Sequence, residues 1–186
     1  NQNVCLILGD NIFHGKDFIS NINQAKKNLE NGFSTIFGVS VNNPENFGVI
    51  EFDNNNIINI IEKPKHPKSK FVVSGLYFYT NDVINHAKSL KPSSRGEKEI
   101  TDVNNTYLSF NKLKLHLLNP TTSWIDTGTY SSLIRASKYF EDYEKNTNKK
   151  AACIEEIAYK MKFINRKELL QIARSMNNSE YGKYLL

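Results

Sequence analysis

The chain has 186 residues, enough for one ordinary domain with a sizeable core. Hydrophobic residues make up 39% and charged residues 23%, a globular balance that excludes a disordered or low-complexity polymer. The net charge of +5 comes from basic residues that form no block or stripe, so we expect no nucleic-acid partner. No apolar run approaches the roughly 18 residues of a membrane span. The two cysteines form no disulfide framework, which favours a reducing, cytoplasmic setting.

The first residues predict a strand, a helix and a second strand. The apolar run from Val4 to Leu8 is typical of a strand buried on both faces of a parallel sheet. Asp17 is the expected cap of a helix whose apolar residues recur at helical spacing, and Asn31-Gly32 ends that helix. Residues 35–41 form the next strand. This order predicts a crossover in a parallel sheet.

The middle of the chain predicts a hairpin and a long interrupted strand. Residues 48–52 and 57–61 flank four turn-forming residues, 53–56, which is a hairpin signature. Residues 71–79 form a strand that Ser74-Gly75 interrupts, and such a glycine marks a bulge or a close approach to the backbone. A helix that begins at Asn81 stops before Pro92.

The remaining elements are mainly helical. We expect a helix over 99–110, an alternating strand over 113–118, and helices over 129–145, 154–161 and 167–176. The prediction is one α/β domain in which residues 1–130 carry the sheet and residues 131–186 form a helical appendage. A buried strand needs neighbours on both sides, and the first one begins almost at Asn1. We therefore expect further sequence upstream.

Two aspartates are candidate metal ligands. Asp10 directly follows the first strand, where open α/β folds bind ligands, although it could instead satisfy a local turn. Asp126 precedes the long C-terminal helix in a Gly/Thr-rich turn and could simply cap it. Two converging carboxylates would suit Mg²⁺, which usually takes one or two protein carboxylates together with substrate phosphates.

Other polar residues are open to two interpretations. Pro64 favours an extended backbone at Lys63, which could aim its charge at a phosphate, but Glu62-Lys63 could equally be a surface ion pair. Arg95 lies in a polar stretch that could be a loop and a helix cap. The four histidines fit no ligand spacing, and the sequence contains no Walker, His-Glu-x-x-His or Gly-x-Ser-x-Gly motif.

Eight short segments in order resemble the sugar nucleotidyltransferases, most closely the glucose-1-phosphate thymidylyltransferases that open dTDP-rhamnose synthesis. Those segments lie at residues 6–13, 43–53, 62–64, 74–79, 90–93, 95–102, 124–129 and 181–186. The resemblance implies a Rossmann-like nucleotidyltransferase fold, mostly parallel, with an inserted antiparallel hairpin region and C-terminal helices. It also implies that dTTP and glucose 1-phosphate react to give dTDP-glucose and pyrophosphate.

The same resemblance assigns roles to individual residues. Asp10 and Asp126 would hold Mg²⁺, and Lys63 would meet the phosphate of glucose 1-phosphate. Arg95 would add positive charge at the phosphate end. The glucose pocket would be lined by Gly48, Glu62, Val73 and Tyr77.

Three expectations concern the whole protein. The family's Gly-rich nucleotide loop is absent, so the chain resembles the C-terminal two-thirds of the enzyme, and alone it is expected to be inactive. The family assembles as homotetramers. It also has a regulatory nucleotide site, whose matching positions here are His14, Gly15, Glu156, Ile157 and Lys160. Tyr and Arg are common in the family at the positions of His14 and Lys160, and Lys lacks the planar fork of Arg.

Two alternatives stay open from the sequence. The missing Gly-rich loop would suit a non-catalytic module that binds sugar nucleotides, whereas the retained aspartate pair favours an enzyme. A uridylyl- or guanylyltransferase acting on another sugar 1-phosphate is the other alternative, because base selection belongs to the segment that the chain lacks.

Overall fold

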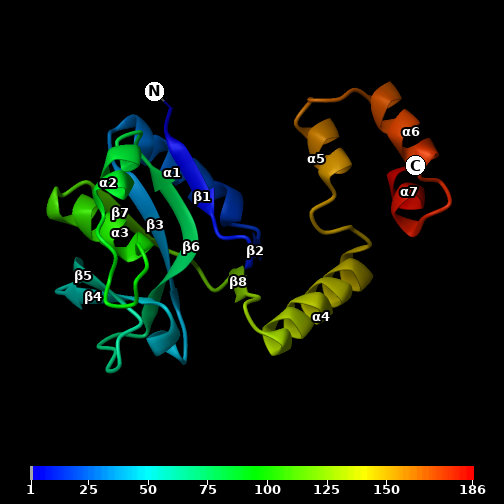
Figure 1. Cartoon of the computed structure of the whole chain (residues 1–186). Helices are drawn as coiled ribbons and strands as arrows, with labels where there is room; N and C mark the ends of the chain where they lie inside the picture. The colour runs from blue at the N-terminus through cyan, green and yellow to red at the C-terminus, as the bar shows by residue number, and fades with distance from the viewer. Residues whose placement is uncertain (1) are drawn as a thin grey trace. The chain divides into compact units, whose positions relative to one another are not determined.

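The computed structural model describes residues 2–186, which divide into two compact units with the boundary between Gly128 and Thr129. The strands of the first unit are β1 (Val4–Ile7), β2 (Asn11–Gly15), β3 (Ser34–Ser40), β4 (Gly48–Asp53), β5 (Asn56–Glu62), β6 (Phe71–Tyr79), β7 (Leu113–Leu117) and β8 (Thr122–Asp126). Its helices are α1 (Phe18–Glu30), α2 (Val83–Ser89) and α3 (Ile100–Ser109), with a 3₁₀ turn at Pro44–Asn46. The second unit contains α4 (Tyr130–Thr147), α5 (Ile154–Lys160), α6 (Arg166–Ser175) and α7 (Glu180–Leu185) (Figure 1).

The predicted α/β class is confirmed, with more antiparallel pairing than expected. The main sheet has the strand order β5-β4-β6-β3-β7, and β1 also pairs with β6. Strand β6 is antiparallel to β1, β3 and β4, while β3 and β7 are parallel. Four strands (β1, β3, β4 and β7) therefore run in one direction, and β5 and β6 run against them. The predicted hairpin is the β4–β5 pair, whose turn residues Asn54 and Asn55 both have positive φ.

One edge of β6 is shared by two strands that lie end to end. Near its start β6 pairs with β4 through Val72, and from Leu76 onward it pairs with β1. The changeover falls at Gly75, where φ is +21° and the register against β3 shifts. The interruption predicted at Ser74-Gly75 is thus real. It leaves a gap in the sheet between the end of β1 and the start of β4.

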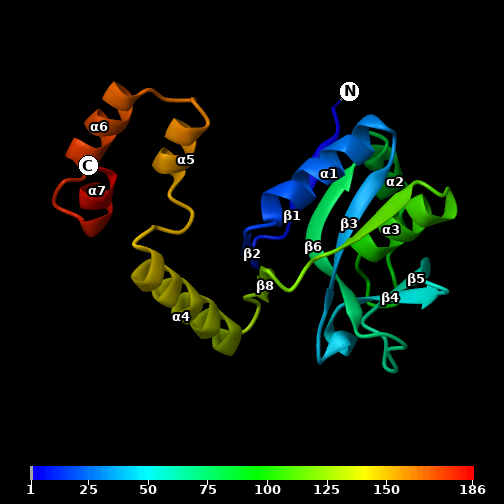
Figure 2. The same cartoon turned by 180° about the vertical axis from the view of Figure 1, so that it is seen from behind.

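Each face of the main sheet has its own core. On one face α2 and α3 pack through Val83, Val103 and Tyr107 against alternate residues of β3 to β7. On the other face α1 packs through Ala25 against Phe37, Leu76 and Phe78. Figures 1 and 2 show these helices from opposite sides of the sheet. Alternation along β3 and β6 sends neighbouring side chains into the two cores.

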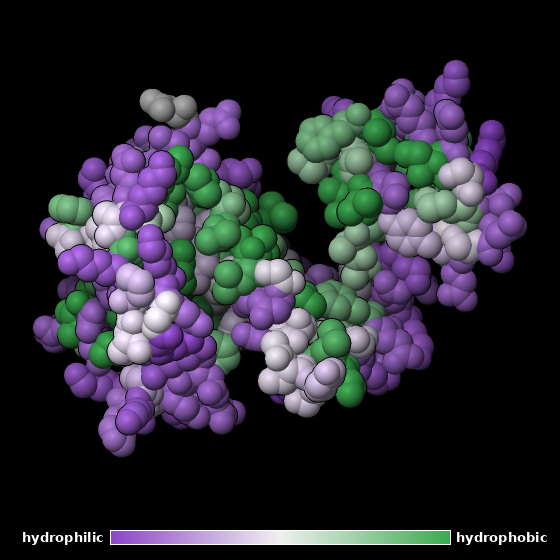
Figure 3. All heavy atoms as spheres, viewed as in Figure 1, coloured by the Kyte–Doolittle hydropathy of each residue, from purple (hydrophilic) through white to green (hydrophobic). Residues whose placement is uncertain are grey.

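Strand β1 is present but is not buried as predicted. Ile7 is 51% exposed and Leu6 is 37% exposed, and Figure 3 shows hydrophobic residues gathered along this strand. Among the described residues β1 pairs only with β6, so its other edge carries no strand. The apolar run correctly predicted a strand. It did not predict how exposed the side chains of this strand are in residues 2–186.

The second sheet was not predicted. Strands β2 and β8 form an antiparallel pair in which Asn11 lies opposite Asp126 and Gly15 lies opposite Thr122. A Cβ at Gly15 would lie 2.3 Å from the carbonyl oxygen of Thr121, so only glycine allows this approach. Helix α1 begins after Asp17 as expected, but the carboxylate does not cap it. Instead, Asp17 Oδ2 accepts a hydrogen bond from Thr121 Oγ1 at 2.6 Å.

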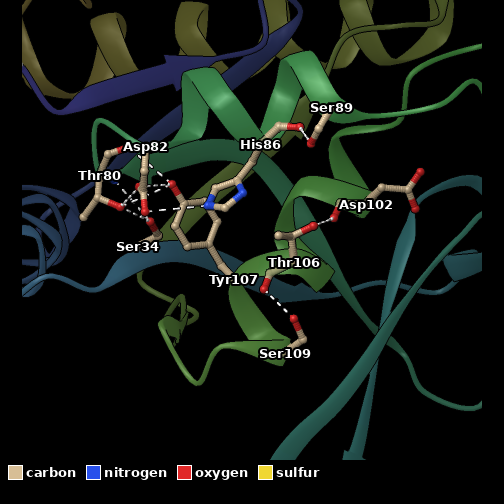
Figure 4. Close-up of polar contacts among 9 residues, drawn as sticks. All are labelled: Ser34, Thr80, Asp82, His86, Ser89, Asp102, Thr106, Tyr107 and Ser109. Carbon is tan, nitrogen blue, oxygen red and sulfur yellow. Dashed lines mark hydrogen bonds and ion pairs between the residues drawn. The ribbon is translucent and has the colours of Figure 1, made fainter.

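A polar cluster lies where β6 ends (Figure 4). Tyr107 donates to Asp82 Oδ1 at 2.6 Å, Thr80 also donates to that oxygen, and His86 Nε2 lies 3.6 Å from Asp82 Oδ2. Burial alone would raise the pKa of Asp82, but the hydrogen bonds from Thr80 and Tyr107 lower it below its usual range. These contacts tie α2 and α3 to the sheet.

The second unit is built from short helices with explicit caps. The Thr129 side chain caps α4 through the backbone of Ser132, and Asn165 and Glu168 form a capping box on α6. Its small core centres on Cys153, Ala173 and Leu185. Helix α7 was not predicted. None of the helices in residues 2–186 is long and apolar enough to span a bilayer.

Candidate active site

A pocket of about 240 Å³ occupies the gap between β1 and β4. Its floor is the β6 segment around Gly75, and one wall comes from the β2–β8 pair. The predicted residues Asp10, Gly48, Glu62, Lys63, Val73, Tyr77 and Asp126 all line it. The other lining residues are Leu8, Asn11, Asn46, Phe47, Gly75, Ile100, Thr101 and Trp124.

The β2–β8 pair brings the two aspartates together from opposite ends of the first unit. Asp126 lies opposite Asn11 in the register, beside Asp10. The Thr127 backbone N–H and hydroxyl both donate to the Asp10 carbonyl at 2.8 Å, which fixes the two turns against each other. A Cβ built on Gly128 would lie 2.9 Å from Asp126 Oδ1 and 3.5 Å from Asp10 Oδ2. Both carboxylates therefore flank one point, where a side chain at position 128 would crowd them.

Each aspartate keeps one oxygen without a hydrogen bond among the described residues. Asp10 Oδ1 accepts from Asn11 Nδ2 at 2.8 Å, and Asp126 Oδ1 accepts from the Gly128 N–H at 2.8 Å. Neither Asp10 Oδ2 nor Asp126 Oδ2 has such a partner in residues 2–186. Two adjacent carboxylates with free oxygens fit a hard divalent cation that keeps other positions for phosphate and water. No group of three or more potential ligands from His, Cys, Asp and Glu occurs in the same residues.

Behind Asp10 lies a buried amide. Asn11 is 8% exposed, and its Oδ1 accepts from the Trp124 indole N–H at 2.6 Å. The Trp124 ring meets Phe47 edge to face, with centroids 5.4 Å apart. A Cβ at Gly75 would lie 2.7 Å from Asn11 Cγ, so the glycine of the strand interruption makes room for this amide. Close backbone approach, predicted at Gly75, is confirmed, and the group that approaches is Asn11.

At the opposite end of the pocket Glu62 is held on both oxygens. Thr101 Oγ1 donates to Glu62 Oε2 at 2.6 Å, and Arg95 Nη1 lies 3.5 Å from Glu62 Oε1. A Cβ at Gly48, which pairs with Glu62 across the hairpin, would lie 3.1 Å from Thr101 Oγ1. Glycine there keeps the space beside the carboxylate free. The carboxylate thus faces the pocket in one orientation.

Lys63 is not extended, contrary to the prediction from Pro64. Its φ is +41°, in the left-handed region that costs a non-glycine residue on the order of 1 kcal/mol. Its backbone N–H donates to the Phe47 carbonyl at 3.0 Å, which holds this conformation. The side chain is exposed at the pocket, with no ion pair in the described residues. Strained backbone of this kind is concentrated at functional sites.

The wall between the two ends is apolar. Val73 and Tyr77 are 7% and 3% exposed, and Tyr77 stacks on Tyr79 with centroids 5.7 Å apart. Burial, and then the charge of Glu62, raises the pKa of the Tyr77 phenol well above its ordinary value. Tyr77 therefore stays a neutral hydroxyl at any physiological pH. It can donate or accept a hydrogen bond.

Several predicted residues lie outside the pocket lining. In residues 2–186, Arg95 is connected to the pocket through its ion pair with Glu62, and it also pairs with Glu97 and Glu99 at 3.1 and 3.7 Å. His14 and Gly15 belong to β2 in the first unit. The other three residues predicted for the regulatory site, Glu156, Ile157 and Lys160, lie on α5 in the second unit. Glu156 pairs with Lys160 and accepts a hydrogen bond from Tyr184 at 2.7 Å, and Ile157 is 46% exposed.

Sequence reasoning missed the residues that hold the predicted ones. Thr101 lies in the first turn of α3, where the sequence indicates only a residue near the start of a helix. The structure shows that it is a hydrogen-bond partner of Glu62. Asn11 follows Asp10, and Trp124 lies two residues before Asp126. Both lie in segments that resemble the family, but nothing in the sequence assigned them a role. The unpredicted β2–β8 pairing brings them into contact.

The sequence profile described as nucleotidyl transferase matches residues 1–143. Curated relatives named glucose-1-phosphate thymidylyltransferase align with this chain over its whole length. The one from Neisseria meningitidis serogroup A is 44% identical and the one from Mycobacterium tuberculosis (strain H37Rv) is 42% identical. In both cases the chain spans 64% of the relative's own length.

Solved structures show the same fold. A crystal structure described as a glucose-1-phosphate thymidylyltransferase from Bacillus anthracis, in complex with a sucrose, has a TM-score of 0.63 and 40% identity, over 75% of this chain and 55% of that one. A UDP-glucose pyrophosphorylase complexed with UDP-glucose has a TM-score of 0.67, over 77% of this chain and 57% of that one. At 23% identity the second likeness concerns the fold alone.

Proposed function

This chain belongs to the nucleotidyl transferase family, and we propose that the protein transfers a thymidylyl group from dTTP to glucose 1-phosphate, giving dTDP-glucose and pyrophosphate. The observation that carries the proposal is a single pocket with two converging aspartates at one end and an oriented glutamate at the other, with a free lysine in its lining. Relatives with this activity in their names are 42–44% identical over the entire chain. Their identity supports dTTP and glucose 1-phosphate as the substrates.

The sugar end provides acceptors and shape. Glu62, fixed by Thr101 and Arg95, accepts hydrogen bonds from glucose hydroxyls, and the neutral phenol of Tyr77 offers a further partner. Gly48 and Val73 line the same pocket and bring no polar side-chain atoms to it. A site that pairs with each hydroxyl rejects analogues that lack one, because its own polar groups would then stay unpaired.

Lys63 brings positive charge to the phosphate of the sugar. In the reaction an oxygen of that phosphate forms a new bond to the α-phosphorus of dTTP, while the bond from that phosphorus to pyrophosphate breaks. Opposite charges 4 Å apart attract by about 4 kcal/mol at an effective dielectric near 20. The lysine therefore orients the nucleophile and offsets the repulsion between two anions. Arg95 contributes mainly by holding Glu62, given its contacts.

Asp10 and Asp126 would hold Mg²⁺, which the free oxygens and the glycine-lined space between them fit. When bound, the ion supplies charge neutralisation on the phosphate oxygens. The two aspartates themselves fix its place relative to Lys63. This arrangement favours an enzyme over a module that only binds sugar nucleotides.

Regulation and assembly are proposed from the family resemblance alone. His14, Gly15, Glu156, Ile157 and Lys160 would contribute to a second nucleotide site between subunits, and the protein would be a homo-oligomer, a tetramer as in the family. Because Lys160 forms an ion pair with Glu156, a nucleotide would have to compete with Glu156 for that lysine.

Calorimetry tests the proposed function. Glucose 1-phosphate and dTDP-glucose are titrated into the protein with Mg²⁺, and GDP-mannose is the control. Selective binding of the glucose ligands, lost in Glu62→Gln, is the expected result. Equal binding of GDP-mannose, or no binding to a folded sample, would contradict the substrate assignment.

A further inference from the structure

We infer that Asn11 is a positioning residue for Asp10, and that Trp124 sets the orientation of its amide. The inference rests on the proposed metal-binding role of Asp10. It concerns a chain of two hydrogen bonds, from the Trp124 indole to Asn11 and from Asn11 to Asp10, at 2.6 and 2.8 Å. We call this chain the Trp–Asn–Asp relay.

The donor chemistry fixes the direction of the relay. An indole N–H can only donate, so the atom of Asn11 that faces Trp124 is the amide oxygen. The amide nitrogen then faces Asp10, whose ionised carboxylate can only accept. A flipped amide would leave both contacts unsatisfied, in a side chain that is 8% exposed. Asn11 therefore has one stable orientation.

Packing keeps the relay in place. The β2–β8 register places Asn11 opposite Asp126, so the amide lies between the two aspartate-bearing turns. Gly75 presses against Asn11 from β6, with space for a hydrogen only, and Phe47 meets the Trp124 ring edge to face. Asn11 and Trp124 are therefore both held by packing against residues that line the pocket, Gly75 and Phe47.

The consequence lies at Asp10. With Oδ1 occupied by Asn11, the carboxylate turns its second oxygen toward Gly128 and Asp126. Outer hydrogen bonds of this kind orient metal ligands, and their loss typically weakens metal affinity about 10- to 100-fold. A leucine at position 11 could fill the same space but would leave Asp10 free to rotate. Asparagine gives both the shape and the donor.

Mn²⁺ binding followed by electron paramagnetic resonance tests the relay without any turnover. Mn²⁺ prefers the same oxygen ligands as Mg²⁺. We expect Asn11→Ala to weaken Mn²⁺ binding about 10- to 100-fold, and Trp124→Phe, which keeps an aromatic ring on Phe47, to weaken it about 3- to 10-fold. Asn46→Ala is the matched control. Asn46 also lines the pocket and has no hydrogen bond with Asp10 in residues 2–186, so this variant should bind Mn²⁺ as the wild type does.

The wild-type protein offers a second readout. Trp124 is the only tryptophan of this sequence, so the tryptophan fluorescence of a protein with this sequence reports on this site. Mn²⁺ should change that fluorescence in the wild type at the concentration at which it binds, and should change it less in Asn11→Ala, where the indole no longer connects to Asp10.

The outcomes separate the two claims. Wild-type Mn²⁺ affinity in folded Asn11→Ala and Trp124→Phe, judged by circular dichroism and thermal melting, would overturn the relay and leave the metal assignment standing. Should Asn11→Ala fail to fold, Trp124→Phe alone decides between these results. An absence of Mn²⁺ binding in the wild type would overturn the metal site and the relay with it.

Discussion

The two ends of the pocket hold their carboxylates in different ways. Glu62 has a partner on both oxygens, whereas Asp10 and Asp126 each have a partner on one oxygen only, within the described residues. A carboxylate held on both sides presents fixed acceptor positions, which suits the directional hydroxyls of a sugar. A carboxylate with a free oxygen beside another one suits a cation. We propose that these different neighbours give similar side chains different tasks.

The largest expected effect breaks the cation end. Asp126→Asn keeps the shape of the side chain but removes its charge, and turnover in the whole protein should fall at least about 10²- to 10³-fold, as for the loss of other charge-stabilising groups. Mn²⁺ affinity should fall in parallel, while the thermal melting temperature stays near that of the wild type. Near-normal turnover would remove Asp126 from the mechanism.

Lys63→Ala comes next, because Lys63 brings a positive charge to the pocket lining. The loss of a hydrogen bond to a charged group, worth about 1.5–3 kcal/mol, predicts about a 10- to 100-fold loss in kcat/KM for glucose 1-phosphate. Lys65→Ala, an exposed lysine two residues further on, is the matched control and should leave kcat/KM unchanged. A change confined to the response to dTTP would show that Lys63 meets the other substrate.

Thr101→Val sharpens the comparison at the sugar end. The variant keeps the volume of the side chain but removes the donor to Glu62 Oε2. We expect about a 10-fold weaker binding of glucose 1-phosphate, from the loss of one hydrogen bond to a charged acceptor, and unchanged Mn²⁺ affinity.

Arg95→Met should have a smaller effect than Thr101→Val, because Arg95 is partly exposed and its ion pair with Glu62 is long. Calorimetry with both ligands measures the difference, and a larger loss in Arg95→Met would reverse the order proposed here.

The smallest effect on ligand binding is expected outside the pocket. Tyr107→Phe removes a hydrogen bond to Asp82 and should lower the free energy of unfolding by about 1–2 kcal/mol at pH 7, with ligand affinity unchanged. The pKa of Asp82 is lower in the folded protein than its ordinary value near 4, so this stabilisation is present above about pH 4 and is lost as the pH falls through the folded pKa. Urea unfolding at pH 7 and pH 3 measures it. A difference between the two proteins that grows at pH 3 would contradict the assignment.

The sequence predicted most strands and helices of the first unit, because their periodicity and turn residues act locally. The burial of β1 could not be predicted in the same way, because it depends on which segments pack against the strand, and those segments lie far from it in the sequence. The β2–β8 pair was missed because each strand is only five residues long and the two lie far apart in the chain. That pairing converts Asp10 and Asp126 from two separate candidates into one site.

The candidate site was predicted at the level of residue types. Motif residues such as Lys63 and Asp126 were identified, and the structure brings them to one pocket. The orientation of these side chains could not be predicted from the sequence. The contacts of Thr101 with Glu62 and of Trp124 with Asn11 join residues that are 39 and 113 positions apart, and only the folded chain reveals them.

The central claim is that the two ends of the pocket act separately, and one crossed titration tests it most directly. Mn²⁺ and glucose 1-phosphate are each titrated by calorimetry into the wild type, Asp126→Asn and Glu62→Gln, with each ligand added in the absence of the other. We predict that Asp126→Asn loses Mn²⁺ binding but keeps glucose 1-phosphate, and that Glu62→Gln does the reverse. Loss of both ligands in both folded variants would contradict the division of the pocket into a cation end and a sugar end.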